Sequence, residues 1–121
     1  MIKSPNWLSK ILKEETVTST NDRLAELCQE KEIKEFTTLM AEYQTAGKGQ
    51  RGNSWESEYG KNLTFSTVFY PQTIAPASQF ILSMAVASAI RTALAHYVHA
   101  DCLQIKWPND IYWKDKKIVG I

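Results

Sequence analysis

One stretch of the chain reads Gly47-Lys48-Gly49-Gln50-Arg51-Gly52 and continues with Asn53, Ser54 and Trp55. It holds three of the five glycines in the whole sequence. Glycine adopts backbone conformations that other residues avoid and lets the backbone come close to a ligand. Successive backbone N–H groups next to a lysine and an arginine suit an anion. The stretch therefore predicts either an anion-binding loop or a flexible surface turn.

The elements around this glycine-rich loop (residues 47–52) argue against a dinucleotide-binding fold. The spacing fits Gly-x-Gly-x-x-Gly, which in that fold follows a strand and opens a helix. A strand is predicted before the loop at 37–43, but residues 53–62 lack a helical apolar stripe and residues 63–69 alternate like a strand. A protein kinase is excluded, because 121 residues without a His-Arg-Asp or Asp-Phe-Gly motif cannot form that fold.

Length and composition indicate one globular domain. The 121 residues are 44% hydrophobic and 22% charged, with a formal net charge of +1. This balance provides no broad field for nucleic acid or an anionic membrane. Cys28 and Cys102 have no metal-type spacing and are expected to be free thiols. The N-terminus lacks an apolar signal core, and polar residues interrupt the longest apolar stretch, 80–98, so we expect a cytoplasmic protein without a membrane span.

Before the loop, the sequence predicts a helical turn at 7–12, a short strand at 14–18 and a helix from residue 19 to about Lys31. Ser19 and Asp22 have the spacing of a capping box, which begins a helix. Capping alone would account for the polar run at 19–21, without any ligand.

After residues 63–69, Pro76 suits the first turn of a helix that is expected to end near His99. Its wide apolar face predicts deep packing. His96 and His99 are interpreted as imidazoles near the negative end of this helix, with a metal site as the alternative.

The last part of the chain predicts two short strands, 103–107 and 111–113, a tight turn at 114–116 and a return strand from 117. The chain stops within this apolar strand. We therefore expect further strands after Ile121, and self-association through the open strand edge.

A second motif follows the predicted helix. It reads Lys106-Trp107-Pro108-Asn109-Asp110 and precedes Lys117-Ile118-Val119-Gly120-Ile121. With Ser19-Thr20-Asn21 and the glycine-rich loop, it resembles the catalytic domain of biotin protein ligases over most of the chain. The resemblance implies an α+β fold with a mixed, largely antiparallel sheet and packed helices, similar to class II aminoacyl-tRNA synthetases. It also implies ATP-dependent activation of biotin to biotinyl-AMP, followed by transfer to a lysine of a biotin carboxyl carrier protein.

The same resemblance assigns roles to individual residues. Ligands would be biotin and ATP, with Mg²⁺, and the loop would shield the acyl adenylate from water. The biotin-binding positions implied are Ser19, Thr20, Asn21, Gln44, Gly47, Lys48, Gly49, Gln50 and Lys117. The positions implied for ATP or the adenylate are Trp55, Lys106, Asn109 and Asp110, and Asp110 is also the candidate Mg²⁺ ligand. The residues expected to act in catalysis are Lys117, Lys48, Gln50 and Arg51.

The loop departs from the family's usual pattern. Biotin protein ligases commonly read Gly-Arg-Gly-Arg where this chain reads Gly47-Lys48-Gly49-Gln50. Lysine keeps the charge but loses the two-pronged guanidinium, and Gln50 has no charge. We hypothesise that this loop retains the adenylate less tightly than a loop with two arginines.

Residues 1–121 are interpreted as a single partial catalytic domain. No room exists before residue 19 for a helix-turn-helix module, and the family's C-terminal domain is missing, so a monofunctional ligase without nucleic-acid binding is expected. Two alternatives stay open. The chain could be an incomplete remnant that binds biotin without adenylating it, or a lipoate or other acyl ligase of the same superfamily.

Overall fold

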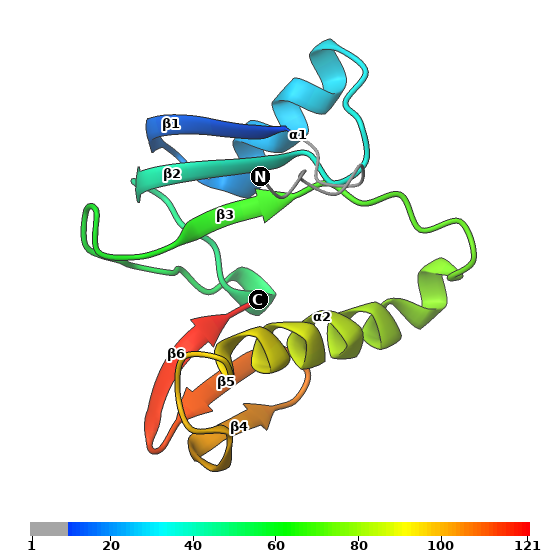
Figure 1. The fold of residues 1–121 in the computed structure, drawn as a ribbon. Helices are drawn as coiled ribbons and strands as arrows, with labels where there is room; N and C mark the ends of the chain where they lie inside the picture. The colour runs from blue at the N-terminus through cyan, green and yellow to red at the C-terminus, as the bar shows by residue number, and fades with distance from the viewer. Residues whose placement is uncertain (1–9) are drawn as a thin grey trace, which may run out of the picture. The chain divides into compact units, whose positions relative to one another are not determined.

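The computed structural model describes residues 10–121, which form two compact units, one ending at Tyr70 and one running from Pro71 to Ile121 (Figure 1). The elements of the first unit are β1 (Ile11–Val17), α1 (Thr20–Glu30), β2 (Thr38–Gln44), a 3₁₀ turn η1 (Gln50–Gly52) and β3 (Thr64–Thr67). Those of the second are η2 (Pro76–Ser78), α2 (Gln79–Leu94), η3 (Ala100–Cys102), β4 (Leu103–Lys106), β5 (Asp110–Trp113) and β6 (Lys116–Gly120).

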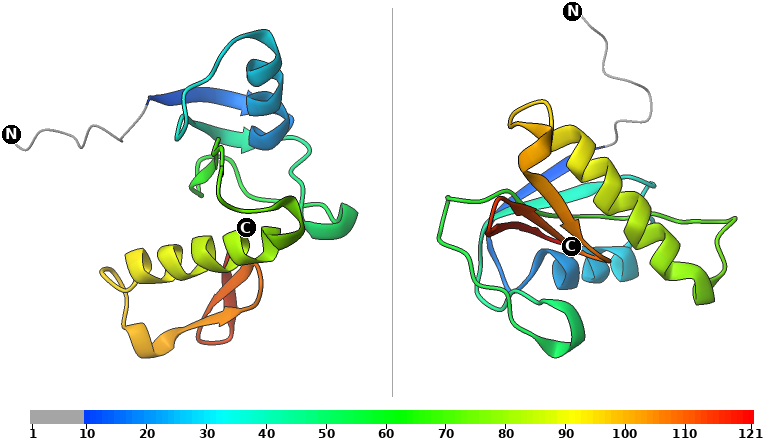
Figure 2. Two further views of the ribbon diagram at one scale, coloured as in Figure 1. Left: turned by 90° about the vertical axis from the view of Figure 1, so that its right-hand side faces the viewer. Right: turned by 90° about the horizontal axis from the view of Figure 1, so that it is seen from below.

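In the first unit, α1 covers one face of a three-stranded sheet (Figures 1 and 2). The strand order is β1-β2-β3, with β1 parallel and β3 antiparallel to β2. The buried core consists of Leu24, Leu27, Ile33 and Leu39, with Leu12 and Val68 packed against it. This core holds α1 against the sheet, and a hydrogen bond from Thr20 to Gln44 joins the start of α1 to the end of β2.

The predicted start of α1 is confirmed. The Ser19 hydroxyl accepts a hydrogen bond from the Asp22 N–H at 3.0 Å, which satisfies one of the open donors of the first turn. The helix ends at Glu30, next to the predicted Lys31, and buries Leu24 and Leu27.

The helical turn predicted at 7–12 is wrong at Ile11 and Leu12, and its first three residues lie outside the described part. These two residues begin β1, where they pair with Thr38 and Leu39 of β2. Local apolar spacing suggested a turn, but pairing with a strand distant in sequence decides the conformation here. The predicted strand at 14–18 is confirmed within β1.

As predicted, the glycine-rich loop joins two strands, and within it only the short turn η1 is helical. The predicted alternation at 63–69 is confirmed around β3. Its more apolar face is the exposed one, with Leu63 80% and Phe65 50% exposed. The opposite face places Ser66 beside α1, where it bonds to helix residues.

In the second unit, α2 packs on β4 and β5 of an antiparallel sheet with the order β4-β5-β6 (Figure 2). Its buried residues include Ala87, Leu103 and Ile111. The predicted strands are confirmed to within one residue at their ends. The predicted turn is confirmed at 114–115, while Lys116 already begins β6, and Lys114 has the positive φ of 55° that a tight turn uses. Only β1 and β2 pair in parallel, so the α+β class with largely antiparallel sheets is confirmed for the described residues.

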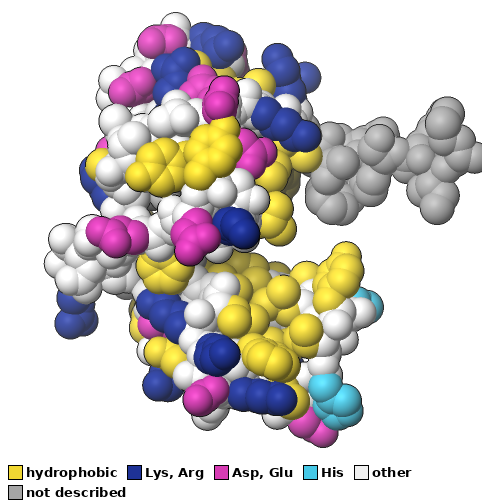
Figure 3. All heavy atoms as spheres, turned by 90° about the vertical axis from the view of Figure 1, so that its left-hand side faces the viewer, with side chains coloured by type: hydrophobic (Ala, Val, Ile, Leu, Met, Phe, Trp, Pro, Cys, Tyr) yellow, Lys and Arg dark blue, Asp and Glu magenta, His cyan; other side chains and the backbone are white. Residues whose placement is uncertain are grey.

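The prediction that α2 is deeply packed is wrong. Ala87 is its only fully buried residue, while Phe80, Ile81, Met84 and Val86 are 37–59% exposed. A 16-residue helix is about 24 Å long, whereas strands of four or five residues cover about 13–17 Å. Figure 3 shows hydrophobic side chains gathered on the surface of this unit.

By length and composition alone, the helical segment Pro76–Leu94 is long and apolar enough to cross a membrane. Core helices of soluble proteins also pass this test.

The predicted end of α2 at His99 is also wrong, because the helix ends at Leu94. Beyond it, the His96 N–H bonds to Ala93 O, three residues back, which tightens the chain into a turn. The Arg91 guanidinium donates to the carbonyl oxygens of Ala100 and Leu103 and ties α2 to η3 and to the start of β4. His96 and His99 therefore follow the helix, and no group of three metal-ligating side chains is present among the described residues.

Candidate functional site

A polar network joins the first turn of α1 to β2 and β3. The Thr20 N–H donates to Gln44 Oε1 at 2.8 Å, and the Thr20 hydroxyl lies 2.7 Å from the Ser66 hydroxyl. The Ser66 hydroxyl in turn donates to Asn21 Oδ1 at 2.7 Å. Ser19 and Thr20 are only 2% and 3% exposed. The structure thus brings together the predicted biotin-binding residues from positions 19 to 21 and Gln44.

The network has a fixed direction. A hydroxyl carries one proton, and Ser66 donates its proton to Asn21, so Thr20 must donate to Ser66. The amide oxygens of Asn21 and Gln44 therefore already accept protein protons, which leaves their N–H groups as the donors for a ligand. A carbonyl oxygen fits these donors, and N–H groups fit the remaining lone pairs of Thr20. This pattern complements a neutral, urea-like group.

Ser66 was missed by the sequence analysis, which read it only as part of an alternating strand. We expect Ser66→Ala to weaken biotin binding about 5- to 30-fold, because one or both of two hydrogen bonds of about 1 kcal/mol each would no longer orient Thr20 and Asn21. Calorimetric titration with biotin measures the effect. Thr67→Val is the matched control. Thr67 lies beside Ser66 on β3, and the substitution removes a hydroxyl that pairs with the hydroxyl of Thr38 on β2. Equal losses in both variants would contradict a role for Ser66 in orienting Thr20 and Asn21.

The glycine-rich loop is closed by its own backbone. The Trp55 N–H donates to Gly47 O at 2.8 Å, and Lys48 and Ser54 form an antiparallel bridge. The Gly49 N–H donates to Asn53 O at 2.6 Å. A Cβ on Gly47 would collide with the Trp55 carbonyl oxygen and lie 2.8 Å from Gln44 Nε2. Gly47 is therefore required for the loop to come this close to Gln44.

The charged residues of the loop differ in their surroundings. Lys48 Nζ forms an ion pair with Asp22 Oδ1 of α1 at 3.0 Å. Gln50 and Arg51 lie on the exposed turn η1, where Arg51 has a positive φ of 56°. The loop therefore places one lysine at the start of α1 and turns Arg51 outward on its tip.

A pocket of about 580 Å³ lies beside the loop in the first unit. It is lined by residues 43–47 and 54–58, which include Gln44, Gly47 and Trp55. Biotin and adenylate positions predicted from the sequence thus share one cavity. Tyr43, also in the lining, packs against Tyr59 with ring centroids 6.1 Å apart.

Tyr59, which packs against the pocket residue Tyr43, is tied to β1 by a hydrogen bond. The Tyr59 hydroxyl donates to Glu15 at 2.6 Å, and this bond raises the pKa of Tyr59 above its usual value. Since only the neutral phenol donates, the stabilisation is complete below pH about 10 and is lost as the pH rises through the raised pKa. We expect the wild type to have a higher melting temperature than Tyr59→Phe at pH 8, and the difference to shrink as the pH rises through the raised pKa of Tyr59. Tyr97→Phe, at an 86% exposed position, is the control. A gap that persisted at high pH would contradict this assignment.

The second unit holds the remaining predicted site residues. Asp110 Oδ1 forms an ion pair with Lys117 Nζ at 3.0 Å across β5 and β6, where the two side chains are 25% and 35% exposed. Lys106 Nζ lies 4.2 Å from the centre of the Tyr112 ring, a cation–π geometry. The Asn109 amide donates to Ile121 O at 3.4 Å. One hairpin and its flanking residues thus hold these four positions together.

Asp110 alone does not make a metal site. Its carboxylate pairs with Lys117, and the described residues offer no second carboxylate or imidazole that completes a cluster with it. Magnesium binds several oxygens, which in nucleotide sites come largely from phosphates and water. The residues present therefore fit a magnesium ion only as a companion of bound phosphate.

Comparison with known proteins assigns the family. Residues 14–121 match the family model described as Biotin/lipoate A/B protein ligase family. The chain belongs to this family. It is 37% identical over 105 residues to the bifunctional ligase/repressor BirA of Escherichia coli, covering 87% of this chain and 32% of that protein. It is 34% identical over 120 residues to the biotin–protein ligase of Homo sapiens, covering 93% of this chain and 16% of that protein.

Solved ligase structures share the fold. The biotin protein ligase of Leishmania major in complex with biotin superimposes with a TM-score of 0.76 at 30% identity, over 97% of this chain and 50% of that one. The Aquifex aeolicus enzyme in complex with biotin and ATP gives 0.68 at 29% identity, over 92% and 44%. The chain thus spans about a third of BirA and half of the Leishmania enzyme. The absence of a DNA-binding module stays a prediction, since BirA is a repressor as well as a ligase.

Proposed function

We propose that this chain is the biotin- and ATP-binding part of a biotin protein ligase, an enzyme that forms biotinyl-AMP and transfers biotin to a lysine of a biotin carboxyl carrier protein. The observation that carries the proposal is the directed polar network of Thr20, Asn21, Gln44 and Ser66 beside the glycine-rich loop. It offers a urea-like ring both donors and acceptors. The relatives from Homo sapiens and Leishmania major named above are biotin protein ligases, which favours biotin over lipoate.

The charges suit the first chemical step. In that step, a carboxylate oxygen of biotin attacks the α-phosphorus of ATP, and pyrophosphate leaves with the electrons of the broken P–O bond. Two anions must meet, so the enzyme has to supply positive charge and N–H donors where negative charge develops. In the first unit, Lys48 and Arg51 are the proposed sources, and Gln50 contributes a neutral amide. In the second unit, Lys117 is the proposed source. Lys106, Asn109 and Asp110 are proposed for the nucleotide, and Trp55 for the adenylate.

The glycine-rich loop is also proposed to protect the acyl adenylate from water. An acyl adenylate hydrolyses when water reaches it, so exclusion of water favours transfer to lysine. We propose that the loop folds over the adenylate and excludes water, a gating role for residues 47–52. Mg²⁺ would neutralise phosphate charge when it binds with ATP, next to Asp110.

Pyrophosphate release tests the proposal. The purified chain is incubated with ATP and Mg²⁺ and with biotin, lipoate or neither. Release that depends on biotin alone is the expected result. Release with lipoate but not biotin would assign the chain to lipoate activation instead. Biotin binding without release would indicate the remnant that binds but does not adenylate, and the same assay on a chain extended beyond Ile121 then shows whether adenylation needs the additional residues.

Gln50 sets a further expectation. Gln50→Arg restores the charge that the family loop commonly carries, and we expect biotinyl-AMP to dissociate about 5- to 10-fold more slowly, because a charged hydrogen bond adds about 1 kcal/mol or more over a neutral one. Filter-binding of labelled adenylate measures the release rate. Asn53→Arg adds the same charge just after η1 and serves as the control. An unchanged rate in Gln50→Arg would contradict the idea that Gln50 weakens retention.

A further inference from the structure

Asp22 carries a contact that the proposed function does not explain. Its carboxylate holds Lys48 Nζ at 3.0 Å, and Lys48 directly follows Gly47, which lines the pocket. The two side chains are 42% and 62% exposed, so the ion pair exchanges readily with other ions. Before any ligand binds, the ammonium group of Lys48 is thus already paired with a carboxylate.

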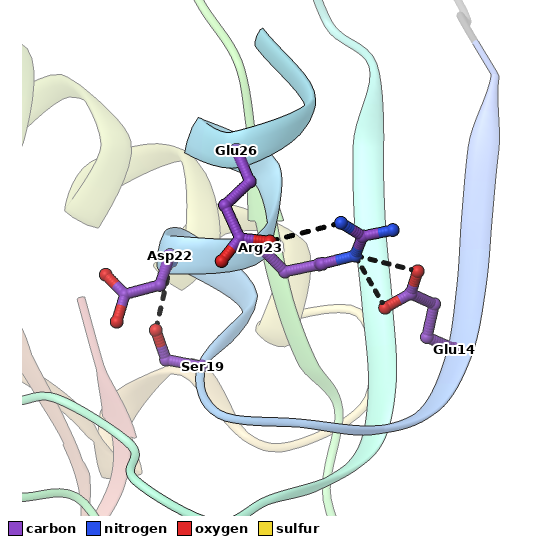
Figure 4. A network of polar contacts seen from close by, with 5 residues as sticks. All are labelled: Glu14, Ser19, Asp22, Arg23 and Glu26. Carbon is purple, nitrogen blue, oxygen red and sulfur yellow. Dashed lines mark hydrogen bonds and ion pairs between the residues drawn. The ribbon is translucent and has the colours of Figure 1, made fainter. Parts of the chain in front are cut away.

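The rest of α1 does not neutralise Asp22. Arg23, its neighbour, bonds to Glu14 of β1 at 3.0 Å and to Glu26 at 3.1 Å. Figure 4 shows the Asp22 carboxylate pointing away from Arg23 and these two partners. Only the backbone N–H of Asp22 is used in capping, by Ser19, so the carboxylate is available to Lys48.

We propose that Asp22 is the internal counter-ion of the glycine-rich loop, which competes with the carboxylate of biotin for Lys48. The inference rests on the proposed function. In the free protein Asp22 holds Lys48 and keeps the loop near the first turn of α1. When biotin binds, its carboxylate takes the place of Asp22 beside the ammonium group. Asp22 is thus a positioning residue. It lowers the affinity for the anionic substrate, and it lets Lys48 exchange between the Asp22 carboxylate and the biotin carboxylate.

Comparing two ligands shows whether Asp22 competes with the biotin carboxylate for Lys48 or only supports the loop. Biotin carries the carboxylate, whereas biotinamide has the same ring without the charge. We expect Asp22→Asn to bind biotin about two- to fivefold more tightly in calorimetric titrations, with biotinamide unchanged. Asp22→Glu should behave like the wild type. Glu26→Gln is the matched control, since it removes one carboxylate and one ion pair from the same helix without touching the loop. Weaker biotin binding by Asp22→Asn, or equal shifts for both ligands, would overturn the proposal.

A second measurement needs no ligand. Trypsin cleaves after Lys48 and Arg51, and an ion pair that holds the loop slows this cleavage. We expect Asp22→Asn to be cut about two- to fivefold faster at these sites than the wild type and Glu26→Gln. Equal rates would show that the ion pair does not hold the loop and would overturn that half of the proposal. If the wild type bound neither biotin nor biotinamide, the proposed function would fail, while the trypsin comparison would still decide the ion pair.

Discussion

Gly47→Ala is expected to lower biotin affinity about 10- to 100-fold while leaving the fold intact. A Cβ at this buried position collides with the Trp55 carbonyl oxygen, which is backbone and cannot rotate away. The collision pushes apart the Trp55 and Gly47 strands of the loop and displaces Gln44, whose amide bonds to Thr20. Overpacking of this kind costs about 1–3 kcal/mol, which corresponds to that loss of affinity.

The matched control is Gly52→Ala in the same loop. Gly52 has a positive φ of 80°, so alanine is strained there, but a Cβ would meet no atom within 4 Å. The strain is about 1 kcal/mol and falls on the exposed turn η1 rather than on Gln44. Calorimetric titration with biotin and circular dichroism of both variants are the measurements. Loss of biotin binding in Gly52→Ala but not in Gly47→Ala would show that the tip, and not the close approach at Gly47, forms the site.

Lys117→Gln is expected to reduce biotin-dependent pyrophosphate release about 100- to 1000-fold. Removing one positively charged or N–H donor from a site of developing charge has effects of this size. The substitution also leaves Asp110 without its ion-pair partner, which adds a negative charge where phosphate is expected. Its effect on the free energy of unfolding should be small, about 1 kcal/mol or less, because Lys117 is partly exposed.

Lys116→Gln controls for the loss of charge on the same strand. Lys116 pairs with Trp113 at the start of β6 and is exposed. We expect its pyrophosphate release to be within about twofold of the wild type. Asp110→Asn separates the two roles of Lys117, since it removes the ion pair but keeps the ammonium group. Similar large losses in Lys116→Gln and Lys117→Gln would mean that general charge, and not Lys117 itself, supports the reaction.

Local signals in the sequence predicted most of the first unit. The Ser19 cap, the strand before the glycine-rich loop and the absence of a helix after it all depend on residues close in sequence. The start of β1 was mispredicted, because Ile11 and Leu12 take their conformation from Thr38 and Leu39. The burial of α2 was mispredicted for a related reason. An apolar face shows which side of a helix can pack, but not how much surface lies opposite it.

The candidate site shows the same difference between features that residues close in sequence predict and features that only the fold reveals. Motif resemblance pointed to Thr20, Asn21 and Gln44, and the structure brings them together. Ser66 and Asp22 were missed as site residues, because a serine in a strand and an acid in a first helical turn have ordinary structural explanations. Only the fold shows that one bonds to two site residues and the other to Lys48. Cytoplasmic location, self-association through β6 and the limits of the domain stay predictions from the sequence.

Direct titration of the purified protein with biotin tests the central claim, which is that the start of α1 and the glycine-rich loop form a biotin site. We expect saturable binding of one biotin per chain, and biotin-dependent protection of Lys48 and Arg51 from trypsin. We also expect Gly47→Ala to weaken the binding. Absence of binding at millimolar biotin, or binding that Gly47→Ala leaves unchanged, would contradict a biotin site at the start of α1 and the glycine-rich loop.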